Sequence, residues 1–252
     1  MIQPKPSRDT KGLLLAVACL ALVFAQPAGA QDLSITLADD GSLATRSVQL
    51  LVLVTVLSLV PGIAIMVTCF PFMVTVLAIL RQAIGLQQSP PNMLMISIAL
   101  FLTYFVMEPV FLASWEAGIS PLLEGAIDVE TAFTRAMPPL RDFMEARINP
   151  ETLAELAALR PELPQNLTVE ETPLSVVIPS FLLSEMERAF QIGFLIFLPF
   201  LIIDLVVAAV LMSMGMMMVP PAIVALPFKL AFFVVADGWS LIAASLVRGY
   251  TG

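Results

Sequence analysis

The sequence predicts an all-α membrane protein, built from hydrophobic helical hairpins with a small acidic helical insert. Hydrophobic residues make up 59% of the 252 residues and charged residues only 13%, about half the charged share of an average soluble domain. Several uncharged runs reach the roughly 20 residues that a helix needs to cross a bilayer. The acidic residues concentrate in one region. Most of the chain is therefore expected to lie in lipid or inside an assembly.

The first 30 residues (1–30) have the pattern of a cleavable signal peptide. Lys5, Arg8 and Lys11 precede an apolar stretch, and small residues follow at 28–30, where signal peptidase would cut. An uncleaved signal anchor is the alternative, although the apolar stretch is short for a membrane span. Cleavage would remove three basic residues and one acidic residue, so the formal net charge would change from -8 to -10.

The mature chain would keep one cysteine, Cys69, and it has no histidine. The usual zinc sites and nucleophile–imidazole pairs therefore lack their commonest residues. The negative net charge offers no basic surface for nucleic acid. We expect no catalytic residue, no metal, no cofactor and no nucleic-acid partner, so the protein is not expected to be an enzyme.

The mature chain divides into four parts by composition. They are a polar lead (31–46), N-terminal hydrophobic helices (47–112), an acidic insert (113–185) and a C-terminal helical hairpin (186–252).

The hydrophobic part begins with an uncharged run, 47–80, that is too long for one perpendicular span. It must tilt, kink, fold back or extend beyond the membrane. A single crossing would place Arg81 inside and the acidic insert outside, in the periplasm, in agreement with the positive-inside tendency. A fold-back at Pro61-Gly62 would place the insert in the cytoplasm instead. A second apolar segment covers 93–112.

The insert carries eleven acidic residues and four arginines between 115 and 173. Within it, Asn149 and Pro150 suit the cap and first position of a short helix. A solvated loop and a partner-binding surface both remain open for this region. At its end, Glu185, Glu187 and Arg188 form a charged cluster. Carboxylates two residues apart on a helix face different directions, so we expect a surface or subunit contact there.

The C-terminal part reads as two apolar segments, 192–211 and 222–246, joined by a turn. Asp204 lies 13 residues before Met217 and Lys229 lies 12 residues after it. At 1.5 Å of rise per residue, both lie roughly 18–20 Å from the turn. We predict a buried ion pair between them. The alternative is that each faces a water-filled cavity or a neighbouring subunit.

Five of the 14 methionines fall between 212 and 218. Gly215, Pro220 and Pro221 are expected to end both helices and shape the loop between them. Three interpretations are open for the methionines: packing of irregular core space, soft-metal binding in a copper or solute transporter, or a soft seal around an axis shared by several copies.

Long strings in this sequence resemble the FliP/SctR family of type III secretion export-gate subunits. The earlier strings are Pro-Pro-Asn at 90–92 and Ala-Leu-Phe-Leu-Thr at 99–103. The later strings are Gln-Ile-Gly-Phe at 191–194, Phe-Leu-Pro-Phe-Leu-Ile-Ile-Asp at 197–204, Met-Gly-Met-Met-Met-Val-Pro-Pro at 214–221, Leu-Pro-Phe-Lys-Leu at 226–230 and Asp-Gly-Trp at 237–239.

The resemblance implies a pore subunit of the flagellar export gate, in the bacterial inner membrane at the flagellar basal body. It implies a helical, ring-like homo-oligomer, a pentamer, that contacts lipid and works with FliQ- and FliR-like subunits and FlhA- and FlhB-like components. Unfolded flagellar proteins would pass through it, and Met216, Met217 and Met218 would form a gasket. It also implies that the helices sit largely above the bilayer plane. An injectisome homologue is the nearest alternative, and the Pro-rich stretch 141–173 departs from the family pattern.

Overall fold

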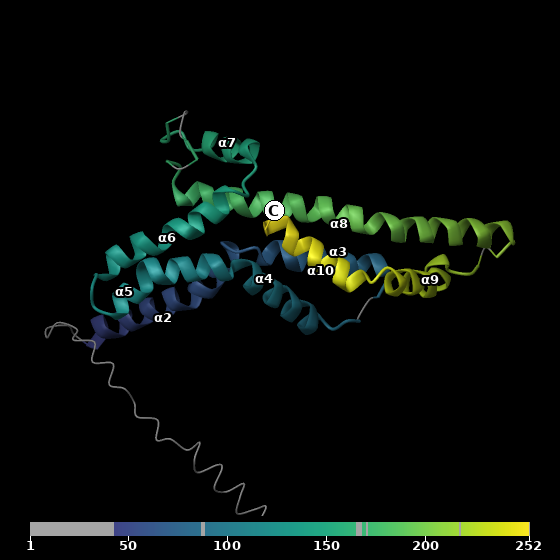
Figure 1. Cartoon of the computed structure of the whole chain (residues 1–252), viewed down its shortest axis with the longest axis horizontal. Helices are drawn as coiled ribbons and strands as arrows, with labels where there is room; N and C mark the ends of the chain where they lie inside the picture. Colours follow the sequence, from purple (N-terminus) through teal and green to yellow (C-terminus); the bar gives the residue numbers. More distant parts are fainter. Residues whose placement is uncertain (1–42, 87–88, 165–167, 170, 217, 252) are drawn as a thin grey trace, which may run out of the picture. The chain divides into compact units, whose positions relative to one another are not determined.

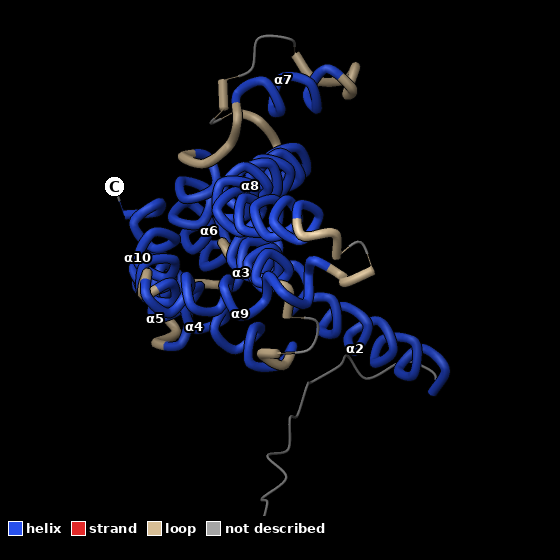
Figure 2. Tube along the Cα trace, turned by 90° about the vertical axis from the view of Figure 1, so that its right-hand side faces the viewer, coloured by secondary structure: helices blue, strands red, loops and turns tan. Residues whose placement is uncertain are grey.

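The structure, a computed structural model, describes residues 43–86, 89–164, 168–169, 171–216 and 218–251. Within these ranges the chain contains helices and loops and no strand, which confirms the all-helical prediction for them (Figure 1; Figure 2). The predicted signal peptide lies outside the described residues. The elements are α2 (Leu43–Met66), α3 (Phe70–Ile84), α4 (Asn92–Ser114), the π-helix η1 (Trp115–Ile119), α5 (Ser120–Leu123), α6 (Val129–Glu145), α7 (Pro150–Ala158), α8 (Leu174–Ser213), α9 (Pro221–Val235) and α10 (Gly238–Thr251).

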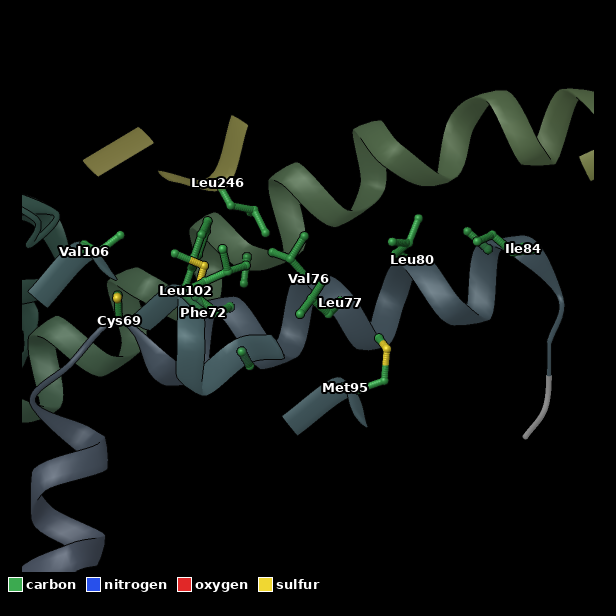
Figure 3. Packing of buried hydrophobic residues seen from close by; sticks show 14 of the residues in the cluster. Cys69, Phe72, Val76, Leu77, Leu80, Ile84, Met95, Leu102, Val106 and Leu246 are labelled. Carbon is green, nitrogen blue, oxygen red and sulfur yellow. The ribbon is translucent and has the colours of Figure 1, made fainter. Parts of the chain in front are cut away.

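The chain separates into two units, 1–54 and 55–252. In the second unit α3 is the central helix, and it packs against α4, α8 and α9. Its buried side chains recur every three or four residues, as on one broad face of a helix. Figure 3 shows several of them meeting Leu102 of α4 and Leu246 of α10. The buried α3 residues are Phe72, Met73, Val76, Leu77, Leu80, Ala83 and Ile84.

Residues at both ends of α3 explain its length. Pro71 lies in its first turn, where the missing backbone N–H has no helical partner to lose. Gly85 ends the helix with a φ of 88°, and its amide donates a hydrogen bond to the carbonyl of Gln82 at 3.0 Å. Such a left-handed glycine is a common helix stop. The C-terminal carbonyls of α3 are thereby presented to the neighbouring helices.

The long uncharged run, 47–80, is broken at a different place from the proline–glycine pair. Pro61 lies inside α2, and the helix continues through Gly62 to Met66. The break comes at 67–69, directly before α3. The helix break in this run therefore lies next to Pro71, at the start of α3, and not at Pro61.

Within the described residues, three helical segments are long and apolar enough to cross a membrane: Arg46–Met66, Asn92–Leu123 and Leu174–Ser213. The helices α9 and α10 meet the same test only together, and they are bent by 62°. The apolar segment predicted over 222–246 therefore contains two helices with a bend between them, and not the single helix of a simple hairpin. Asp237 has a φ of 49° at the bend, and a Cβ on Gly238 would lie 2.2 Å from the Phe233 ring.

The helix α8 is twice as long as its apolar part suggests. It begins at Leu174 and runs for 40 residues, whereas the apolar segment recognised in the sequence starts at 192. The compositional boundary between insert and hairpin, at 185, falls inside this helix. In Figure 1 α8 extends past α3, and α9 returns along its C-terminal half.

Candidate functional site

The turn between α8 and α9 is closed by local backbone geometry. The amides of Gly215 and Met216 donate to carbonyls of the last α8 turn at 3.1 and 3.0 Å, the pattern of a Schellman motif. Gly215 has a φ of 77°, which glycine adopts without steric cost. Pro220 precedes α9 and Pro221 occupies its first turn. The three expected loop-shaping residues thus lie where one helix ends and the next begins.

The methionines at and just before this turn are exposed wherever the structure describes them. Met218 is 97% exposed, so its side chain makes almost no packing contacts within its own chain. Met216, Met212 and Met214 are also exposed, and Met217 lies outside the described residues. Thioether side chains are flexible and polarizable, and they adapt to irregular surfaces.

The structure brings Asp204 of α8 and Lys229 of α9 together. The Nζ atom of Lys229 lies 2.7 Å from Oδ2 of Asp204. The same ammonium donates a hydrogen bond to the carbonyl of Ala83, near the C-terminus of α3, at 3.0 Å. A cation there also interacts favourably with the helix dipole. Lys229 therefore joins three helices, a role that the hairpin geometry alone did not suggest.

The two partners of this ion pair differ in burial. Lys229 is buried, whereas the side chain of Asp204 is 33% exposed. Among the described residues, the buried Oδ1 atom of Asp204 has no hydrogen-bond partner. Lys229 thus donates to two acceptors, whereas the Oδ1 atom of Asp204 accepts no hydrogen bond from the described residues.

The described residues contain no group of three or more His, Cys, Asp or Glu side chains arranged for a metal ion. The one cysteine among them, Cys69, lies between α2 and α3 and is fully buried. Burial raises the pKa of its thiol from 9.0 to about 12. Cys69 is therefore a neutral core side chain at neutral pH.

Comparisons with known proteins agree over most of the chain. A family model described as the FliP family matches residues 53–246. The chain is 52% identical over 238 residues to the "Flagellar biosynthetic protein FliP" of Caulobacter vibrioides, which covers 94% of this chain and 89% of that protein. It is 44% identical over 213 residues to the protein of that name from Bacillus subtilis, covering 84% and 96%. The chain belongs to the FliP family.

A further FliP relative, from Rhizobium meliloti, is 48% identical over 212 residues, covering 84% of this chain and 86% of that protein. The segment matched by the family model contains the methionine turn, Asp204 and Lys229. It ends at 246, four residues before Tyr250. FliP is not a known enzyme family.

The charged cluster at 185–188 lies only partly at the surface of this FliP-family chain. Glu187 is exposed, as expected of a surface or subunit contact, but the side chain of Glu185 is 0% exposed, so the expectation for Glu185 is wrong. Glu185 lies in the N-terminal half of α8, and its Oε1 atom is 3.1 Å from Nε of Arg147. Its other oxygen accepts a hydrogen bond from the hydroxyl of Tyr250 in α10. The expectation was wrong because these partners lie 38 and 65 residues away, beyond the reach of helix periodicity.

Proposed function

We propose that this chain is a core pore-forming subunit of the flagellar type III protein export gate in the bacterial inner membrane. In this role it passes unfolded flagellar proteins across the membrane, and Met216, Met217 and Met218 seal the closed pore. The observation that carries the flagellar assignment is the 52% identity to a flagellar biosynthetic protein over 94% of the chain. The apolar helices are long enough to place it in a membrane.

The gasket proposal rests on the position and exposure of the methionines. Met218 is 97% exposed at a turn whose backbone is shaped by Gly215, Pro220 and Pro221. A large apolar side chain without a partner in its own chain is available to another surface. Several copies around one axis would bring such turns together, and flexible thioethers would close the gap between them.

The assembly is proposed to be a ring-like homo-oligomer, a pentamer, that binds FliQ- and FliR-like subunits and works with FlhA- and FlhB-like components. Both helices of the hairpin expose large apolar side chains, which supports burial against partners or lipid. They include Phe194, Leu205 and Val206 on α8 and Ile223 and Phe228 on α9. The acidic insert is proposed to lie in the periplasm, with residues 1–30 removed as a signal peptide. N-terminal sequencing of the purified protein tests the cleavage.

The ion pair between Asp204 and Lys229 is proposed to lock the hairpin that carries the methionine turn. The 2.7 Å contact supports this role, and so does the hydrogen bond from Lys229 to the carbonyl of Ala83. The turn would then be held at a defined distance from the core helix α3.

The test of the gasket replaces Met216, Met217 and Met218 together by alanine in the assembled gate. We expect increased leakage of ions and small solutes and altered export of flagellar proteins, because the replacement removes the apolar seal. Replacing Met212 and Met214 by alanine is the matched control, since both methionines are exposed and lie directly before Gly215 of the turn. Unchanged permeability and export in the triple variant would contradict the gasket, as would equal leakage in the control.

The assembly itself is tested by native mass spectrometry and electron microscopy of the detergent-extracted protein. The chain is expressed alone and then together with its FliQ- and FliR-like neighbours. A ring that captures those neighbours is the expected result. A stable monomer that ignores them would argue against the gate subunit.

A further inference from the structure

Arg147 connects the acidic part of the chain to two distant helices. It lies in the short connection between α6 and α7, at 146–149. Its Nε atom is 3.1 Å from Oε1 of Glu185 in α8. Its guanidinium also donates a hydrogen bond to the carbonyl of Gly249 in the last turn of α10 and lies 3.9 Å from the ring centroid of Tyr250. One side chain thus makes an ion pair, a helix-terminal hydrogen bond and a cation–π contact.

Tyr250 holds the end of α10 in the core by both parts of its side chain. Its hydroxyl donates a hydrogen bond to Oε2 of Glu185. Its ring meets Phe72 of α3 edge-on at 5.4 Å and stacks on Phe143 of α6 at 6.0 Å between centroids. One turn earlier, Leu246 is buried in the main apolar cluster. The end of α10 is therefore anchored between α3, α6 and α8.

Glu185 is well paired only while both partners are in place. Its side chain is fully buried, and a buried carboxylate without partners is strongly unfavourable. The remaining cation near it, Arg188, lies 3.9 Å away and is partly exposed, which is beyond hydrogen-bonding distance. Moving Arg147 away, or undocking Tyr250, would leave one oxygen of Glu185 without its partner.

The polar contacts that join α10 to distant parts of the chain lie in this cluster. Within the described residues, the side chain of Ser240 bonds only to Asp237 in the adjacent α9–α10 connection, whereas the side-chain hydrogen bonds that reach distant elements are those of Arg147 with Gly249 and of Tyr250 with Glu185. Elsewhere on α10, the contacts are apolar: Trp239 meets the Phe233 ring edge-on at 5.4 Å, and Ile242 packs on the main apolar cluster. The long-range polar contacts of the helix are thus at its C-terminal end.

We propose that Arg147, Glu185 and Tyr250 form a latch that couples the docking of α10 to the position of the α6–α7 connection. A movement of the acidic insert that withdraws Arg147 releases the end of α10, and release of α10 loosens the connection in return. The coupling is reciprocal because both partners stabilise the same buried carboxylate. This device is separate from the methionine turn and does not depend on the proposed export role.

Hydrogen–deuterium exchange of the full chain in detergent tests the latch. In Arg147→Gln we expect the amides of 238–251 to exchange roughly ten-fold faster or more, because a charge-assisted contact that holds α10 is lost. The exchange of α3 is expected to stay unchanged. Arg160→Gln is the matched control, since Arg160 pairs with Glu162 in the same insert through an exposed contact at 3.5 Å. The control is expected to leave α10 unchanged.

Tyr250→Phe provides the second test, because it keeps the ring that packs on Phe72 and Phe143 and removes only the hydroxyl. We expect faster exchange at 146–149 and in α7 as well as in α10. An effect confined to α10 would overturn the coupling. Unchanged α10 exchange in Arg147→Gln would also overturn it, and so would an equal rise in α3, α8 and α10, which would mean general loss of the fold.

Discussion

Asp204 and Glu185 both lie on α8, and each belongs to an ionic site within the described residues. The two sites are built differently. In the α8–α9 hairpin, Asp204 is 33% exposed and pairs with Lys229 at 2.7 Å, and one of its oxygens has no partner among the described residues. At the α6–α8–α10 junction, Glu185 is fully buried and both of its oxygens are paired. The ion pair of the first site joins helices that are neighbours along the chain, although Lys229 also bonds Ala83 of the distant α3. The ion pair of the second site joins elements that are not adjacent along the chain.

The difference indicates a division of roles between the two regions. The exposed part of the Asp204 side chain lets water or another subunit reach this pair, whereas its unpaired Oδ1 atom is itself buried. A closed cluster, with every carboxylate oxygen paired, holds the fold of its own chain together. The hairpin is therefore expected to adjust within an assembly, and the junction is expected to decide the stability of the single chain.

The largest effect is expected for Glu185→Ala at the junction. The substitution leaves Arg147 largely buried without its carboxylate, and breaking a buried pair in this way costs about 3–5 kcal/mol. Unfolding of the chain in mixed detergent–SDS micelles measures this loss. Glu162→Ala is the control, because it breaks an exposed pair with Arg160 and is expected to change stability by less than about 1 kcal/mol. Equal losses in both variants would remove the distinction between the sites.

A smaller effect is expected for the hairpin pair. Asp204→Ala and Lys229→Ala should each destabilise the chain, and the double variant should lose less than the sum of the two. We expect a coupling energy of about 1–3 kcal/mol from the double-mutant cycle, below the loss at Glu185 because Asp204 is partly exposed. Additive losses would show that the 2.7 Å contact does not hold the hairpin.

The free energy of unfolding is expected to depend on pH through Cys69. Burial is the main cause of the raised pKa of its thiol, and the Glu185 carboxylate raises this pKa further. The native chain holds the thiol proton more tightly than the unfolded chain. Stability should therefore fall as pH rises above 9.0, the unfolded value, toward about 12, by up to about 1.4 kcal/mol per pH unit. Unfolding measured between pH 9.0 and about 10, a range that does not exceed the ordinary pKa values of tyrosine and lysine, should lose this slope in Cys69→Ser. An equal pH dependence of stability in the unaltered chain and in Cys69→Ser would contradict this role of Cys69.

The smallest effect on stability is expected at the methionine turn. Met218→Ala removes a side chain that is 97% exposed, so the free energy of unfolding of the single chain should change by less than about 0.5 kcal/mol. The same SDS titration measures it. A loss as large as that for Asp204→Ala would mean that the turn serves the fold of its own chain. That outcome would weaken the proposed division between the two regions.

The local features of the fold could be predicted well from sequence. The helix at Pro150 is present, and the side chain of Asn149 accepts a hydrogen bond from the amide of Glu151 at its start. The apolar segment predicted over 93–112 corresponds to α4, Asn92–Ser114. The hairpin turn falls where Gly215 and Pro221 indicate. Each of these features depends on neighbours within a few residues, and such signals are visible along the chain.

Breaks caused by packing were not predictable in the same way. At the bend between α9 and α10, the Phe233 ring occupies the space where a side chain on residue 238 would lie. Asp237-Gly238 is a turn signal in the sequence, but hydropathy over 222–246 does not show the angle between the two helices. Similarly, the N-terminal half of α8 is less apolar than its C-terminal half, yet it continues as one helix because Val177 and Phe181 are buried in a second apolar cluster with Met144.

The sequence by itself determined the helical class, the apolar segments, the methionine turn and the equal depth of Asp204 and Lys229. These follow from composition and from the constant rise of a helix on either side of one short turn. Only the tertiary structure decided that Glu185 is buried, that Lys229 reaches Ala83, and that Arg147 meets α10. These contacts arise from the packing of helices that are distant in the chain, and a local pattern contains no information about which distant faces meet.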